Sequence, residues 1–158
     1  GCTIRHVRAA RSGGESMSGL SPTQRTLRAL REQGRVCAIV EHWNAFGGPV
    51  VDGKRVGHRI DLFGILDIIS LDPQRGVVGI QSTGTGFSAH LKKLTEERHQ
   101  ECCDWLSTPG TRLELWGWRK IKVVRGGKAM RWTPRVLELK LEDFMAGDIK
   151  DCLEEEEE

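Results

Sequence analysis

A single acidic residue stands inside an apolar stretch of β-strand character, and it restricts the fold more than any other feature of the chain. Asp67 interrupts the apolar run of residues 65–71. A carboxylate buried there without a partner would be strongly destabilising. Asp67 therefore requires a metal ion, a cation or a hydrogen-bond network beside it, as is typical of functional sites.

The residues that follow this run predict a β-hairpin. Residues 72–76 read Asp-Pro-Gln-Arg-Gly, a turn composition in which Pro fixes φ and Gly permits a positive φ. A hairpin centred on this turn places Asp67 opposite Gln81, and opposed side chains share a face with their Cβ atoms roughly 4.5–5.5 Å apart. Thr83 has the same parity as Gln81. An acid, an amide and a hydroxyl are therefore predicted to converge on a patch that can hold a divalent ion.

Length and composition indicate one intracellular domain. A chain of 158 residues is large enough to bury roughly two thirds of its unfolded surface without disulfides. We expect a disordered leader over residues 1–19, a single domain over 20–146 and an acidic disordered tail over 147–158. No apolar run is long enough for a membrane span, so we expect no membrane partner and a cytoplasmic location. The cysteines are odd in number and lack the spacing of a disulfide or zinc framework: Cys2, Cys37, Cys102, Cys103 and Cys152.

Charge is distributed unevenly along the chain. Residues 36–137 carry fifteen basic and ten acidic side chains, a net charge of +5, whereas residues 138–158 carry two basic and ten acidic side chains, a net charge of −8. This asymmetry predicts a basic working surface and an acidic, solvated end.

Periodicity and capping signals give the order of the elements. Ser21 is an N-cap, Pro22 takes the first helical position and Gln24 completes a capping box. Residues 135–144 are compatible with either a last strand or a short helix. The predicted elements are a helix from residue 22 to Gly34, strands over 36–43, 60–71 and 76–81, a loop over 44–57, a helix over 88–106, a strand over 112–118 and a hairpin over 120–125 and 128–133.

This α-β-β-β-α-β order, with the motif Gly64-Ile-Leu-Asp67, resembles the PD-(D/E)XK nuclease superfamily, which includes restriction endonucleases and Holliday-junction resolvases. The resemblance covers roughly residues 21–118 and extends to small nuclease-like proteins of phages and bacteria. It implies an α/β fold: a restriction-endonuclease-like αβββαβ core, with a central mixed sheet flanked by helices and a C-terminal β-hairpin. Dimerisation is common in the superfamily, so the resemblance also implies that a homodimer is one of the assemblies to consider.

The resemblance assigns chemistry to three positions. In active members an Asp and a Glu bind Mg²⁺, and a Lys two residues after the Glu orients the attacking water. Asp67 matches the Asp, whereas Gln81 stands in place of the Glu and Thr83 in place of the Lys. The implied metal ligands are Asp67 and Gln81, with Mg²⁺ or Mn²⁺ as the cofactor. An amide keeps one oxygen ligand but removes a negative charge facing the ion.

Other residues can compensate for these departures. Glu41 and Asp61 are candidates for the missing carboxylate. Asp61 lies about 20 Å from Asp67 along a regular strand, so it can help only if Gly64 introduces a bulge or bend. We expect Lys93 or Lys92, near the start of the next helix, to replace the lysine, and His90 to share the face of Lys93 as a proton carrier.

The last hairpin predicts contact with DNA. Its basic side chains neutralise phosphates, and three nearby tryptophans, Trp116, Trp118 and Trp132, are able to stack on bases. The alternative is an exposed hairpin kept soluble by its charge, with the tryptophans in the core. The basic residues are Arg119, Lys120, Lys122, Arg125, Lys128 and Arg131.

Taken together, these features predict a divalent-metal-dependent DNA endonuclease of phage or bacterial origin, acting in the host cytoplasm if phage-encoded. Asp67, Gln81 and Lys93 are the predicted catalytic residues. A nuclease-fold protein that has lost catalysis and only binds DNA, or a phage or host protein, is the main alternative, because the Glu and the Lys are replaced. An interaction protein unrelated to nucleic acid is a third.

Overall fold

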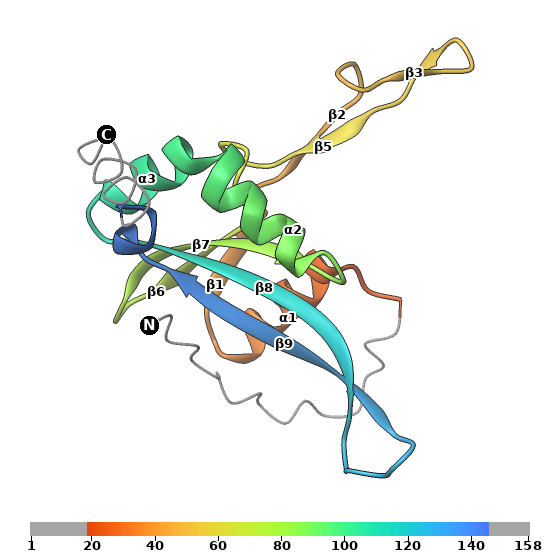
Figure 1. Ribbon diagram of the computed structural model, residues 1–158, viewed down its shortest axis with the longest axis vertical. Coiled ribbons are helices and arrows are strands. Elements are labelled where there is room, and N and C mark those ends of the chain that lie inside the picture. The colour runs from red at the N-terminus through yellow and green to blue at the C-terminus, as the bar shows by residue number, and fades with distance from the viewer. Residues whose placement is uncertain (1–18, 146–158) are drawn as a thin grey trace, which may run out of the picture.

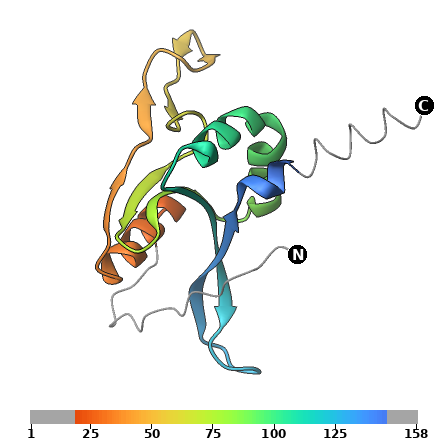
Figure 2. The same ribbon diagram turned by 90° about the vertical axis from the view of Figure 1, so that its left-hand side faces the viewer.

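The computed structural model describes residues 19–145. Apart from Gly19, the predicted leader and the predicted acidic tail lie outside the described residues. The chain forms a five-stranded sheet in the order β1-β6-β7-β8-β9, with helices on both faces (Figures 1 and 2). Strand β7 is central, and it pairs antiparallel with β6 and parallel with β8. The predicted α/β class with a mixed central sheet is therefore confirmed.

The first helix, α1 (Pro22–Glu32), begins with the predicted capping box. The Ser21 hydroxyl accepts from the Gln24 N–H at 3.2 Å, and the Gln24 side chain accepts from the Ser21 N–H at 3.0 Å. Leu30 is fully buried against the sheet. Helix α1 thus covers one face of the sheet, over a core of Ile68, Val78, Ile80, Trp116, Trp118 and Val136.

The other face is covered by a helical segment with a break in its regularity. The single helix predicted over residues 88–106 is replaced by α2 (Phe87–Lys92), a π-helical turn η1 (Lys93–Glu97) and α3 (His99–Ser107). Arg98, at φ −115° and ψ 28°, separates the last two. Such π-helical turns occur mostly inside α-helices and frequently at functional sites. The core on this face contains Ile65, Leu66, Leu94, Cys102, Leu113 and Leu115.

Strands β6 (Ile68–Asp72) and β7 (Gly76–Thr83) form the predicted hairpin. Ile68 pairs with Ile80 and Asp72 with Gly76, so the hairpin is centred on Gln74 as predicted. The prediction of one continuous strand over residues 60–71 is wrong, because the chain folds into a tight turn over residues 61–66. Phe63 and Gly64 have positive φ values of 56° and 72° there, which no strand can accommodate.

The chain between β1 and β6 leaves the sheet as an arm, defined here as residues 42–60 (Figure 1). The strand predicted over 36–43 is split, because β1 (Val36–Ile39) pairs with β6 and β2 (His42–Asn44) pairs with β5 (His58–Ile60). The loop predicted over residues 44–57 contains a small hairpin at the tip of the arm, formed by β3 (Val50–Val51) and β4 (Lys54–Arg55).

Strands β8 (Thr111–Lys122) and β9 (Met130–Leu139) form one long hairpin whose distal half projects from the body (Figure 1). The strand and the hairpin predicted separately over residues 112–133 are thus continuous. Of the segment left open, residues 135–139 continue β9 and residues 141–145 are helical. Between residues 19 and 145, no helix is long and apolar enough to cross a membrane.

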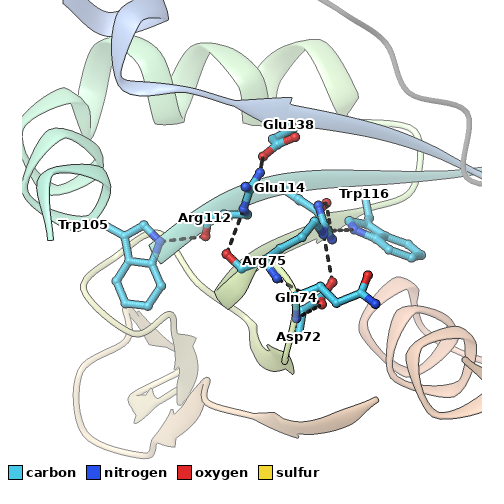
Figure 3. A network of polar contacts seen from close by, with 8 residues as sticks. All are labelled: Asp72, Gln74, Arg75, Trp105, Arg112, Glu114, Trp116 and Glu138. Carbon is cyan, nitrogen blue, oxygen red and sulfur yellow. Dashed lines mark hydrogen bonds and ion pairs between the residues drawn. The ribbon is translucent and has the colours of Figure 1, made fainter. Parts of the chain in front are cut away.

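A polar network joins the β6–β7 turn to the two strands beyond it (Figure 3). Arg75 donates to Asp72 at 2.8 Å and to the buried carboxylate of Glu114 at 3.4 Å. Arg112 donates to the Arg75 carbonyl at 3.0 Å and to Glu138 at 2.6 Å. These contacts bind the turn to β8 and β9, and so help to hold the register on which the positions of Asp67 and Gln81 depend.

Candidate metal centre

Asp67 immediately precedes β6, and only 3% of its surface is exposed. Its backbone N–H donates to the Ile80 carbonyl at 2.8 Å, which continues the β6–β7 pairing by one residue. Its Oδ2 accepts from the Gln81 side-chain amide at 2.8 Å and from the Ser82 backbone N–H at 2.7 Å. The predicted meeting of Asp67 and Gln81 is confirmed. A buried carboxylate requires a metal ion, a cation or a hydrogen-bond network beside it, and these bonds provide the network.

Two further carboxylates join Asp67. The turn over residues 61–66 reverses the chain, so Asp61 lies beside Asp67 rather than far along a strand. Glu41 enters from the segment between β1 and β2, and its N–H contacts the Asp67 carbonyl at 3.4 Å. One oxygen from each of the three side chains lies within 4.8 Å of the others. The bend at Gly64, on which any contribution from Asp61 depended, is therefore present.

Two cations border this cluster. Lys93, the first residue of the π-helical turn, donates to Asp61 Oδ2 at 2.8 Å and to Gln81 Oε1 at 3.3 Å. Arg59 donates to Glu41 Oε1 at 2.8 Å. Three carboxyl groups thus face one ammonium and one guanidinium group. We call the set of Glu41, Asp61, Asp67, Gln81 and Lys93 the acidic centre.

The electrostatics place a proton on Asp67. Burial, together with the neighbouring carboxyl groups of Asp61 and Glu41, raises the pKa of Asp67 to about 8, against the opposing bond from the Ser82 N–H. Burial alone would raise the pKa of Asp61 as well, but hydrogen bonds from Asp67 and Lys93 lower it overall. Burial and the neighbouring carboxylates thus favour the protonated form of Asp67, whereas Lys93 favours the ionised form of Asp61.

This donor set suits a hard dication. Mg²⁺ and Mn²⁺ prefer carboxylate and carbonyl oxygens, and binding of a metal ion drives off protons held by its ligands. The amide of Gln81 is turned so that its nitrogen faces Asp67 and its oxygen faces Lys93. In this orientation Gln81 acts as a hydrogen-bond partner of Asp67, and the carboxylates are the oxygen donors available to a metal ion.

Three of the predicted accessory residues lie outside the acidic centre. The ring of His90 contacts the Gly86 carbonyl at 2.9 Å. Lys92 is well exposed and forms a 3.9 Å ion pair with Glu96. Thr83 is buried, and its hydroxyl lies 3.3 Å from the Cβ position at Gly86. Of the two lysines proposed as replacements, Lys93 is the one at the acidic centre.

Sequence reasoning missed Arg59. Arg59 lies on β5, which ends one residue before Asp61, and no local pattern in the sequence marks its partner. The separation of Arg59 from Glu41 by eighteen positions hid their ion pair.

The projecting half of the β8–β9 hairpin carries the predicted basic surface. All six of the basic side chains predicted to bind DNA are exposed there, namely Arg119, Lys120, Lys122, Arg125, Lys128 and Arg131. The interpretation that Trp116 and Trp118 stack on bases is wrong, because both are buried against α1. Trp118 donates to the Thr26 hydroxyl at 2.8 Å. Trp132 is covered by the Arg25 guanidinium group at 3.7 Å from its ring centroid.

Comparisons with protein-family models, with curated proteins and with solved structures found no match to this chain.

Proposed function

We propose that this chain is a divalent-metal-dependent nuclease that hydrolyses phosphodiester bonds in DNA, on a fold of the restriction-endonuclease-like PD-(D/E)XK type. The proposal depends on one observation above all. Three carboxylate oxygens, from Glu41, Asp61 and Asp67, lie within 4.8 Å of one another, and the Lys93 ammonium group is 2.8 Å from one of these carboxylates.

The order of the elements supports the family assignment. Helix α1 is followed by the antiparallel strands β1, β6 and β7, then by helices, and then by β8 parallel to β7. Asp67 directly precedes the second strand of this series and Gln81 lies near the end of the third. These are the places where the superfamily carries its acidic residues.

The neighbours of Gln81 and Thr83 offset their departures from the superfamily motif. Glu41 and Asp61 supply the negative charge that an amide at position 81 lacks. Lys93 supplies the ammonium group that Thr83 cannot provide. The groups that the superfamily carries on two strands thus come here from four segments of the chain.

Each side chain has a defined role in this proposal. A bound Mg²⁺ or Mn²⁺ would lower the pKa of the attacking water and offset charge on the leaving oxygen. Glu41, Asp61 and Asp67 hold the ion, and Gln81 orients Asp67. Lys93 positions the water and the phosphate oxygens, since its ammonium group pairs with Asp61 and 28% of the side chain is exposed. The basic hairpin holds the DNA backbone.

The experiment is a cleavage assay on supercoiled plasmid and on branched DNA, with Mg²⁺, Mn²⁺ or EDTA. Asp67→Asn keeps the size of the side chain and removes the negative charge that the carboxyl group takes on when an ion displaces its proton, so we expect cleavage to fall roughly 10²-fold or more. Asp104→Asn, an acid-to-amide change on α3, is the matched control and should cut normally. Metal-dependent cutting that persists in Asp67→Asn would refute the assignment.

A second candidate function is DNA binding without catalysis. Lys93 and Arg59 already pair with two of the three carboxylates, so the cluster can be balanced by the chain's own cations. This alternative predicts no cutting, salt-sensitive DNA binding and no Mg²⁺ binding that depends on Asp67 in calorimetry.

A further inference from the structure

A hollow of about 270 Å³ lies at the base of the arm, beside the acidic centre. Its wall includes Glu41, so it adjoins the proposed metal site directly. The wall also includes Ser21 and Gln24 at the start of α1, Ile39 of β1, and His42, Trp43 and Arg59 of the arm. This volume lies just below the roughly 300–1,000 Å³ of pockets for drug-sized ligands, so the hollow can take no more than one nucleotide.

Trp43 is held as a platform on one side of this hollow. A Cβ atom at Gly57 would lie only 2.5 Å from Cζ2 and 2.6 Å from Cε2 of the indole, so the ring packs directly against the Gly57 backbone. Trp43 is nevertheless 63% exposed. The ring is thus supported on one side by the Gly57 backbone, where any side chain would displace it, and it remains open on the other.

Arg59 provides a cation next to this ring. Trp43 and Arg59 are direct partners in the β2–β5 pair, and such opposed side chains lie on the same face of a sheet. The guanidinium group reaches Glu41 at 2.8 Å, while 62% of the side chain stays exposed. Arg59 therefore stands between the aromatic platform and the acidic centre.

The charge of the arm is complementary to a nucleic-acid strand. Residues 42–60 contain three basic residues, Lys54, Arg55 and Arg59, against the single acid Asp52, and also two histidines. A stacking ring beside a cation is the combination with which proteins bind single strands, because every base has a π-face and every nucleotide a phosphate.

We infer that this hollow is a subsite for one unpaired nucleotide of a single DNA strand. Its base stacks on Trp43 and its phosphate contacts Arg59, next to the phosphate that is hydrolysed at the acidic centre. The inference rests on the proposed function and narrows its substrate to DNA with an unpaired nucleotide at the site. A base inside a duplex presents no free face to the ring, so intact duplex does not fill the hollow.

The test is binding of a short single-stranded oligonucleotide containing 2-aminopurine to the full chain in EDTA, where no cleavage occurs. Stacking on an indole quenches this fluorescent base. We expect quenching with the unaltered protein, and loss of quenching with an affinity roughly 5- to 150-fold weaker in Trp43→Ala. Trp43→Phe should restore part of both signals, whereas a duplex of the same sequence should show no quenching that depends on Trp43.

Two further variants make the test specific. Gly57→Ala keeps the Trp43 side chain but places a methyl group where its ring packs, so the ring must shift, and binding should weaken as it does in Trp43→Ala. Phe46→Ala removes another exposed aromatic side chain of the arm and should bind normally. Unchanged binding and quenching in both Trp43→Ala and Gly57→Ala would overturn the inference, as would quenching that disappears with Phe46.

Failure of this inference is distinguishable from failure of the proposed function. If Trp43→Ala shows metal-dependent cutting and unaltered single-strand binding, the subsite is ruled out and the nuclease assignment stands. If quenching depends on Trp43 but the protein cuts none of the DNA substrates under any metal condition, the subsite is supported and the hydrolytic function is ruled out.

Discussion

The ammonium group of Lys93 lies 2.8 Å from the carboxylate of Asp61, although the two residues are 32 positions apart. This ion pair joins the turn before β6 to the first residue of the π-helical turn. Lys93 also contacts Gln81 at 3.3 Å, so one side chain connects the three segments around Asp67.

Replacement of Lys93 should separate metal binding from catalysis. In Lys93→Met the acidic centre loses a cation, so its affinity for Mg²⁺ should be equal or higher, whereas single-turnover cleavage should fall roughly 10²-fold or more because the water loses its positioning group. Lys92→Met is the matched control, since Lys92 is exposed and forms only a 3.9 Å pair with Glu96. Calorimetry and cleavage should be measured on both, and equal cleavage in the two variants would contradict the role of Lys93.

The protonation of Asp67 predicts an unusual dependence of stability on pH. In the folded protein the pKa of Asp67 is about 8, whereas the unfolded chain has an ordinary aspartate pKa of about 4. Between these values the folded state holds a proton that the unfolded state has lost. The contribution of Asp67 to the free energy of unfolding is therefore greatest below about pH 4 and falls as the pH rises to about 8.

Urea denaturation in EDTA across this pH range would measure the effect. Asp67→Asn should flatten the decline, because an amide does not titrate. The same slope in Asp67→Asn as in the unaltered protein and in Asp104→Asn would show that Asp67 is not the titrating group.

Gly64 should be required for the metal site and not merely for stability. Its φ of 72° is costly for any other residue, and a Cβ atom there would lie 3.0 Å from the Arg98 guanidinium group. Gly64→Ala should cost about 1–2 kcal/mol of folding free energy and should weaken Mg²⁺ binding by moving Asp61. Gly53→Ala is a close control, because Gly53 has a φ of 73° with no atom within 4 Å of its Cβ position. Thermal unfolding should show similar losses of stability in the two variants, and calorimetry should show weaker Mg²⁺ binding only in Gly64→Ala. Equal metal affinities in the two variants would show that the turn at Gly64 does not shape the metal site.

The projecting hairpin should contribute to DNA binding through charge alone. Arg125→Ala combined with Lys128→Ala removes two exposed cations near its tip, and the slope of log Kd against log salt should decrease by about 2. Lys140→Ala, an exposed cation just beyond β9, should leave the slope unchanged. A titration at several salt concentrations measures this, and identical slopes for all three proteins would place the DNA elsewhere.

The regular part of the fold was readable from the sequence because its signals are local. The capping box at Ser21 and the turn centred on Gln74 depend on neighbouring residues, and both are confirmed. The same turn fixed the register that brings Gln81 to Asp67.

The rest of the acidic centre depends on backbone geometry that periodicity cannot reveal. Residues 60–71 have the pattern of one strand, and only the left-handed conformations of Phe63 and Gly64 turn Asp61 back toward Asp67. Burial of Trp116 and Trp118 was only the alternative to base stacking, because alternation on a strand identifies a shared face but not what covers it. Here α1 covers that face.

The arm and the acidic centre share their endpoints in the chain. Glu41 directly precedes the first strand of the arm and Asp61 directly follows its last strand, whereas Asp67 is anchored to the central sheet through Ile80 and Ser82. The cluster thus lies where the arm meets the sheet: Glu41 and Asp61 flank the arm, and Asp67 belongs to the sheet. A tilt of the arm relative to the sheet would change the distances between the three oxygens, so the orientation of the arm would also set the shape of the proposed ion site.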